Sequence, residues 1–137
     1  MVSGSCFCGA LQYETSLDDI KGKALCHCSD CHKVSGSTYS TNLIIPKNAL
    51  KFTKGTPKTI SKVCDSGNEI TNSFCGDCGS TICREGETFG DNRVLKAGTL
   101  DGKTGLENAK PALELYAGQR ISWVHNVEGT QDKPGLS

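Results

Sequence analysis

Three spaced clusters of cysteine constrain this chain more than any other feature of its sequence. They are Cys6-Phe7-Cys8, Cys26-His27-Cys28-Ser29-Asp30-Cys31 and Cys75-Gly76-Asp77-Cys78, while Cys64 and Cys83 stand apart from them. The total of nine is odd, so disulfide bonds alone cannot use every cysteine. In a reducing compartment, clustered cysteines more often bind metal than pair with one another. The clusters therefore predict a small fold held together by bound metal.

Composition and charge narrow the class of protein. The chain has 137 residues, the size of one domain, and its 15 Lys and Arg balance 15 Asp and Glu. Nucleic-acid binders usually carry a basic excess, so this balance argues against a nucleic-acid partner. No apolar stretch approaches the roughly 20 residues of a membrane span, and Met1–Ser5 lacks the basic and apolar segments of a secretory leader. We therefore expect a cytoplasmic protein with no membrane partner; the sequence carries no signal for an oligomeric state.

Short alternating segments predict a β-rich fold. Strands are expected over 10–14, 41–45, 50–53, 59–63, 69–74 and 93–100, with a tight hairpin turn at Asp65-Ser66-Gly67-Asn68. Helical signals are short, one turn over 31–34 and another over 111–117, where Pro111 suits an early helical position. The sequence thus predicts a mainly β single domain of small antiparallel sheets with few short helical turns. It divides into a domain over 1–126 and a loosely ordered tail over 127–137, which has little to bury.

Two of the clusters have the spacing of one closed metal site. A Cys-x-x-Cys turn, as in Cys75 to Cys78, brings two thiolates onto one ion but supplies only half of a tetrahedral site. Residues i and i+2 of an extended chain project to the same side, so Cys6 and Cys8 are candidates for the other half. Four thiolates leave no open position, which is typical of a structural zinc.

The second cluster offers three thiolates within six residues, Cys26, Cys28 and Cys31, with no fourth cysteine beside them. Three protein ligands and one open position describe a catalytic zinc. The alternative is an inert site whose fourth ligand is Cys64, Cys83, His27 or His32. We expect His27, which lies between two ligands, to point away from the metal. Cys64 and Cys83 are interpreted as small buried hydrophobes, with a redox protein that uses one of them as a third possibility.

The motifs together resemble a known family. Cys6-x-Cys8-Gly9, Cys26-His27-Cys28-x-x-Cys31 followed by Ser35-Gly36-Ser37, and Phe74-Cys75-Gly76-Asp77-Cys78-Gly79-Ser80 look like the glutathione-dependent formaldehyde-activating enzyme family, which includes the centromere protein V domain. The match runs from about Gly4 to Trp123, and Arg120 and Trp123 resemble its closing Arg-x-x-Trp feature. The resemblance implies a tent-like β fold with two zinc ions. A structural zinc would lie on Cys6, Cys8, Cys75 and Cys78, and a catalytic zinc on Cys26, Cys28 and Cys31.

The resemblance also implies an activity. It points to a zinc-dependent carbon–sulfur lyase or transferase acting on glutathione adducts, of the S-hydroxymethylglutathione type or a bulkier S-conjugate. Zinc would deprotonate the thiol of glutathione, the cosubstrate, at the open position. The partners would be a small-molecule thiol and a carbonyl or S-conjugate. The alternative is a non-catalytic zinc-binding interaction module of the centromere-protein type.

Residues near the second cluster are candidates for the remaining tasks. His32, Ser35 and Ser37 follow it closely enough to move a proton at the substrate hydroxyl, and His32 is the candidate catalytic residue among them. The two carboxylates of glutathione call for cations, for which Lys33 and Arg84 are candidates, as is Arg120.

Overall fold

A computed structural model of the protein describes residues 1–64 and 67–136, so Asp65 and Ser66 of the expected hairpin turn lie outside the described residues. Eleven strands and two short α-helices make up the described part, joined in places by single turns of 3₁₀ helix. The strands are β1 (Val2–Ser5), β2 (Gln12–Thr15), β3 (Gly22–Cys26), β4 (Ser40–Pro46), β5 (Leu50–Lys54), β6 (Lys58–Val63), β7 (Glu69–Phe74), β8 (Thr81–Gly86), β9 (Asn92–Lys96), β10 (Leu113–Leu115) and β11 (Gln131–Asp132). The helices are α1 (Ser29–Ser35) and α2 (Thr104–Glu107). No helix among the described residues is long and apolar enough to cross a membrane.

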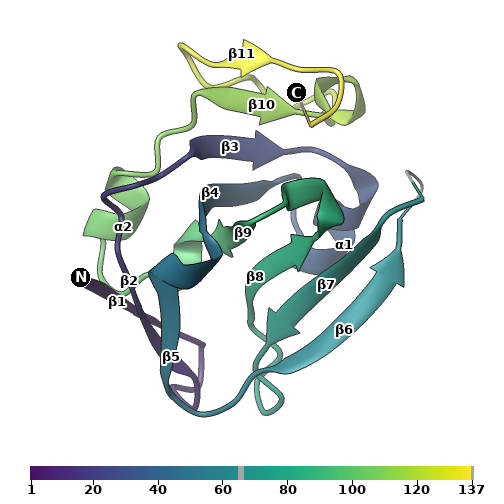
Figure 1. The fold of residues 1–137 in the computed structure, drawn as a ribbon. Coiled ribbons are helices and arrows are strands. Elements are labelled where there is room, and N and C mark those ends of the chain that lie inside the picture. Colours follow the sequence, from purple (N-terminus) through teal and green to yellow (C-terminus); the bar gives the residue numbers. More distant parts are fainter. Residues whose placement is uncertain (65–66, 137) are drawn as a thin grey trace.

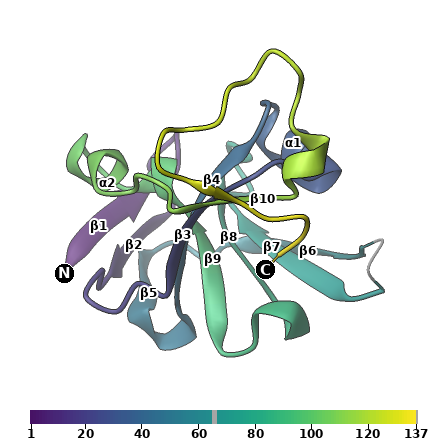
Figure 2. The ribbon, with the colours of Figure 1, turned by 90° about the horizontal axis from the view of Figure 1, so that it is seen from above.

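The strands form two sheets. A three-stranded sheet has the order β1-β2-β5, and an eight-stranded sheet has the order β11-β10-β3-β4-β9-β8-β7-β6. The larger sheet curves round as a half-open shell, with β10 and β11 at one edge and β6 at the other (Figure 1). Seen from above, α1 lies on one side of the molecule and β1, β2 and α2 lie on the other (Figure 2).

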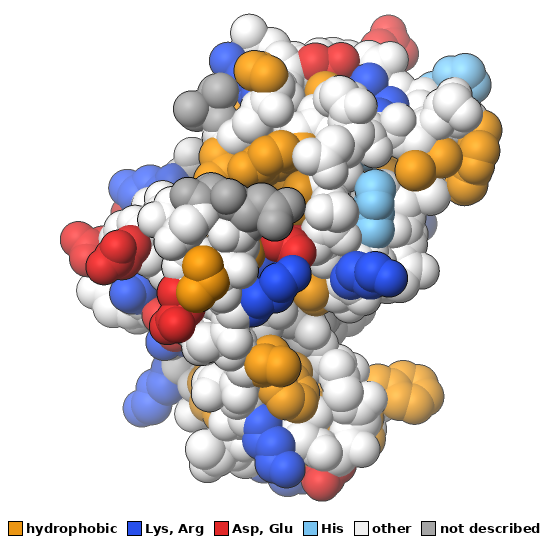
Figure 3. All heavy atoms as spheres, turned by 90° about the vertical axis from the view of Figure 1, so that its right-hand side faces the viewer, with side chains coloured by type: hydrophobic (Ala, Val, Ile, Leu, Met, Phe, Trp, Pro, Cys, Tyr) orange, Lys and Arg blue, Asp and Glu red, His pale blue; other side chains and the backbone are white. Residues whose placement is uncertain are grey.

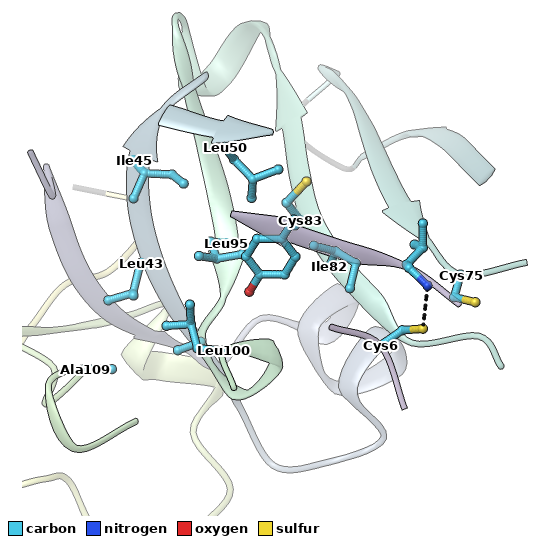
Figure 4. Close-up of a cluster of buried hydrophobic side chains, with 13 residues drawn as sticks. Cys6, Leu43, Ile45, Leu50, Cys75, Ile82, Cys83, Leu95, Leu100 and Ala109 are labelled. Atoms are coloured by element: carbon cyan, nitrogen blue, oxygen red, sulfur yellow. Dashed lines mark hydrogen bonds between the residues drawn. The ribbon is translucent and has the colours of Figure 1, made fainter. Parts of the chain in front are cut away.

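The central strands of the larger sheet have two buried faces, which explains why their sequence is apolar without strict alternation. On one face, Leu43 and Ile45 of β4 join a core cluster with Leu95 of β9, all exposed by 1% or less. This core also contains Tyr13 from the smaller sheet, so it fastens the two sheets together. Figure 4 shows Cys6 and Cys75 at one end of the same cluster. The opposite face of β4 and β9 carries the residues of a cavity described below.

The prediction of a mainly β fold is confirmed, and four predicted strands correspond closely to β4, β5, β6 and β7. The helical turn predicted over 31–34 is part of α1. The strand predicted over 93–100 is β9 to Lys96 and then a 3₁₀ turn, Ala97–Thr99.

One prediction about the last quarter of the chain is wrong. The segment 111–117 is not a helical turn: its residues Leu113–Leu115 form β10, which pairs in parallel with β3 because Leu115 and Glu114 are buried there. In the segment after residue 126, β11 pairs in parallel with β10. Val127 N and Thr130 Oγ1 also donate to Glu114 Oε2, at 2.8 and 2.6 Å. One buried carboxylate, rather than apolar burial, makes these contacts, so composition does not signal them.

Candidate metal centres and the adjoining cavity

The first and third cysteine clusters meet in space and form a four-thiol cluster, Cys6, Cys8, Cys75 and Cys78, with all Sγ atoms within 4.8 Å of one another. Cys6 Sγ lies 3.7 Å from Cys8 Sγ, and Cys8 Sγ lies 3.8 Å from Cys75 Sγ. Two sulfurs bound to one tetrahedral zinc at roughly 2.3 Å lie about 3.8 Å apart. The donor set and its spacing therefore fit a tetrahedral, thiolate-preferring metal ion.

The backbone around the four-thiol cluster is folded to stabilise negative sulfur. The amide of Leu11 donates to Cys6 Sγ at 3.2 Å, and the amide of Asp77 donates to Cys75 Sγ at 3.4 Å. Gly9 and Gly79, directly after the second cysteine of each pair, have φ angles of 79° and 81°, where a side chain would be strained. Hydrogen bonds from Ser80 hold the pKa of Cys78 down, at about 5. These donors favour the thiolate form that a metal requires.

The second cluster forms the cysteine trio, Cys26, Cys28 and Cys31, whose Sγ atoms also lie within 4.8 Å of one another. Cys26 ends β3, and Cys28 caps α1 by accepting a hydrogen bond from the amide of Cys31 at 3.3 Å. Hydrogen bonds from Cys26 and Cys28 lower the pKa of Cys31 to about 2, whereas the pKa values of Cys26 and Cys28 are raised, so the first negative charge of the trio lies on Cys31. Within the described residues no Cys, His, Asp or Glu forms a fourth member of this group.

His27 points away from the trio, as its place between two cysteines predicts. Its ring is fully buried, and Nε2 lies 2.8 Å from Glu114 Oε1. Glu114 is itself fully buried, and burial raises the pKa of its carboxyl group. Hydrogen bonds to the carboxylate outweigh this effect and lower the pKa to about 2; they come from Thr130, His27, the Val127 amide and Arg120. This carboxylate therefore holds two segments together. One is the loop that contains Cys26 and Cys28, and the other is the C-terminal segment.

The trio lines a cavity of about 560 Å³ on the face of the larger sheet opposite the core. Apolar side chains make much of its wall, including Ile44, Ile70, Phe89 and Val94. The remaining lining residues include the trio, Cys64, Asn42, Arg84, Lys96, Tyr116 and Gln119. Figure 3 views the molecule from the side on which α1 and the end of the β6–β7 hairpin lie, and shows hydrophobic side chains gathered in the upper half of that face.

Two cations face the trio within this cavity, Arg84, which is buried, and Lys96, which is partly buried. Arg84 Nη1 lies 3.9 Å from Cys31 Sγ, and Arg84 Nε donates to Asn72 Oδ1 at 2.8 Å. Lys96 Nζ donates to Asn42 Oδ1 at 2.7 Å, and burial lowers the pKa of Lys96. Cations that are fully or partly buried need compensating charge, and the sulfurs of the trio provide it.

The sequence-predicted residues are only partly brought together here. Of the candidates for proton transfer and carboxylate binding, Arg84 lines the cavity; His32, Ser35, Ser37, Lys33 and Arg120 do not. The Nε2 atom of His32 is buried, with no hydrogen-bond partner among the described residues. Sequence analysis missed Lys96 and Asn42. The sequence does carry a signal for these two residues. Side chains alternate along β4 and β9, so the polar residues next to the core residues Leu43 and Leu95 project to the opposite face of the sheet, which lines the cavity.

Comparison with known proteins agrees with the resemblance found in the sequence. The chain matches the family model described as glutathione-dependent formaldehyde-activating enzyme over residues 1–119. It belongs to that family. The predicted resemblance is therefore confirmed, and membership connects the protein to glutathione-related activity.

Solved structures bear on the fold of this family member. A crystal structure of a Rhodobacter sphaeroides protein superposes with a TM-score of 0.62 at 17% identity, over 80% of this chain and 96% of that chain. At this identity the likeness supports the fold alone. No curated protein matches the chain.

Proposed function

We propose that this protein makes and breaks the carbon–sulfur bond of glutathione adducts, as a lyase or transferase, at a zinc ion held by Cys26, Cys28 and Cys31. The observation that carries the proposal is the placement of these three thiols together on the wall of a 560 Å³ cavity. When bound, zinc supplies the positive charge that keeps an incoming thiol in its thiolate form at neutral pH.

The bond changes are simple. In the forward direction the sulfur of the thiol attacks a carbonyl carbon, a carbon–sulfur bond forms, and the thiol proton ends on the carbonyl oxygen as a hydroxyl. In the reverse direction the hydroxyl loses its proton, the carbon–oxygen double bond reforms and the thiolate leaves. Both directions concentrate negative charge on sulfur, so the surrounding side chains must tolerate a second anion beside the trio.

Arg84 and Lys96 meet this requirement. They lie on neighbouring strands of the same sheet; Arg84 is buried and Lys96 is partly buried, so water only partly screens their charges. Asn42 fixes the lysine, because its Oδ1 accepts from Lys96 Nζ while its Nδ2 donates to the carbonyls of Ala24 and Ser40, each at 3.2 Å. We assign Arg84 and Lys96 the role of holding the anionic sulfur of the substrate.

We propose that the four-thiol cluster of Cys6, Cys8, Cys75 and Cys78 holds a second, structural zinc. It joins the segment after β1 to the turn between β7 and β8, at the edge of the main core. Two zinc ions per chain, both on reduced thiols, also suit a cytoplasmic location, which forms part of this proposal.

The test compares the wild-type protein with Cys28→Ala and Cys64→Ala, two cysteine substitutions on the wall of one cavity. Zinc content is measured, and exchange between formaldehyde with glutathione and S-hydroxymethylglutathione is followed by exchange NMR. We expect two zinc ions and accelerated exchange in the wild type and in Cys64→Ala, and one zinc with no acceleration in Cys28→Ala. Full acceleration by Cys28→Ala would overturn the proposal. Loss of acceleration in Cys64→Ala with both zinc ions retained would indicate that Cys64 itself takes part in the exchange.

A further inference from the structure

We infer that the carbonyl or S-conjugate substrate carries an extended apolar substituent of several carbons, and that Ile44, Val94 and Ile70 hold it. This inference rests on the proposed function, since it places the reacting sulfur at the trio. It goes further because it names the chemical class of the reactant that the thiol attacks. The smallest such reactant is a one-carbon aldehyde.

The strand register divides the cavity face of the sheet into successive rows. Cys26 pairs with Ser40, two residues further along β4 Asn42 pairs with Lys96, and two residues further again Ile44 pairs with Val94. With about 3.3 Å per residue, the Ile44–Val94 row lies roughly 13 Å along the strands from the row of Cys26. The order of the rows is therefore sulfur, then polar and cationic, then apolar.

The chemistry of an S-(1-hydroxyalkyl) adduct has the same order. Its sulfur is bonded to a carbon that carries a hydroxyl, and the alkyl group extends from that carbon. With the sulfur at the trio, the hydroxyl lies toward the row of Asn42 and Lys96, whose polar groups suit it. The alkyl chain then extends over Ile44 and Val94.

Both cations of the cavity turn toward the sulfur end, so the far end has no charged side chain and combines apolar residues with two uncharged polar ones, Thr88 and Asn92. Arg84 pairs with Val94 in the sheet, yet its guanidinium reaches back to within 3.9 Å of Cys31 Sγ. Lys96 is held to Asn42 in the middle row. Beyond them the wall continues with Ile70 of β7, whose partner in β8 is Gly86, and with Phe89.

The volume of the cavity is shared between the glutathione half and the carbonyl half of the adduct, so the position of the apolar row, rather than the volume alone, favours an alkyl substituent. At about 560 Å³ the cavity falls within the range of roughly 300–1,000 Å³ that is usual for pockets holding drug-sized ligands. A substrate that left the Ile44–Val94 row covered only by water would forgo the burial of that apolar surface. An alkyl chain recovers it, by about a fourfold gain in affinity for each fully buried methylene.

The test measures binding without turnover. The protein is loaded with Co²⁺ in place of zinc, and the dissociation constants of ethanethiol, butanethiol and hexanethiol are read from the thiol-dependent change in cobalt absorption. Val94→Phe fills the far end of the cavity, and Ile60→Phe is the matched control, because Ile60 lies on the exposed edge strand β6 of the same sheet.

We expect affinity to rise with chain length, by up to about fourfold per methylene, in the wild type and Ile60→Phe. Val94→Phe should keep the affinity for ethanethiol and lose the gain for hexanethiol. Equal affinities along the series, no binding of hexanethiol, or an unchanged gain in Val94→Phe would each overturn the inference, even if formaldehyde adducts are turned over. A clear gain with chain length in a protein that turns over no adduct would support the apolar end of the cavity while refuting the lyase.

Discussion

The substitution Glu114→Gln removes one negative charge from a fully buried position while preserving the shape of the side chain. The carboxylate accepts from four groups: His27 Nε2 and Arg120 Nη2 at Oε1, and Val127 N and Thr130 Oγ1 at Oε2. A glutamine keeps one acceptor oxygen and replaces the other with a donor. Arg120 keeps its ion pair with Asp132, whose Oδ1 lies 2.6 Å from Arg120 Nη2. Either His27 or the Val127 amide, however, then faces the NH2 group of the glutamine, a second donor, in a buried place.

Two physical arguments give the same magnitude for this change. Removing one partner of a buried ion pair typically costs 3–5 kcal/mol, because the other group is left uncompensated. Independently, lowering the pKa of Glu114 from its ordinary 4.5 to about 2 corresponds to roughly 3 kcal/mol of folding free energy at neutral pH. We therefore expect Glu114→Gln to lower the free energy of unfolding by about 3 kcal/mol.

The sign of the pH dependence follows from the direction of this shift. The folded pKa lies below the unfolded value, so the folded state binds the proton less readily. The stabilisation is complete above about pH 4.5 and is lost as the pH falls through about 2. The difference between wild type and Glu114→Gln should stay constant from pH 8 to pH 5 and begin to shrink below pH 4.5.

The assay is equilibrium unfolding in guanidinium chloride with a fixed excess of zinc, at several pH values. Glu128→Gln is the matched control, since Glu128 is exposed on the same C-terminal segment, and its effect should stay within about 0.5 kcal/mol. A loss below 1 kcal/mol for Glu114→Gln at pH 7, or a loss that grows on acidification, would refute the reasoning.

Three further substitutions test other parts of the structure. Cys8→Ser should reduce bound zinc from two ions to one per chain and lower the thermal midpoint, as measured by metal analysis and calorimetry; retention of two ions would contradict the four-thiol site. His32→Ala should leave exchange of formaldehyde with glutathione within twofold of wild type, because His32 does not line the cavity; loss of exchange with intact zinc would restore its catalytic role. Gly4→Ala should cost about 1–3 kcal/mol in chemical unfolding, since a Cβ there would lie 2.0 Å from the ring of Tyr13; an effect no larger than that of the exposed Val2→Ala would contradict this packing.

Local spacing was sufficient to predict the thiol sets. A Cys-x-Cys segment in extended chain and a Cys-x-x-Cys turn each fix two sulfurs on one side, whatever the rest of the fold does. Alternation likewise predicted β6 and β7, which are neighbours in the sequence and pair with each other. The outward direction of His27 follows from the same two-residue period.

Only the tertiary structure decided what surrounds the trio. Lys96 lies 65 positions after Cys31, and the pairing of β4 with β9 brings it to the cavity face; nothing local to Lys96 signals this. The same holds for β10, whose parallel pairing with β3 overrides the proline signal of 111–117. Such positions depend on contacts between distant strands. Spacing within a motif is a property of the local chain, whereas the charge and apolar surface around a site come from long-range pairing.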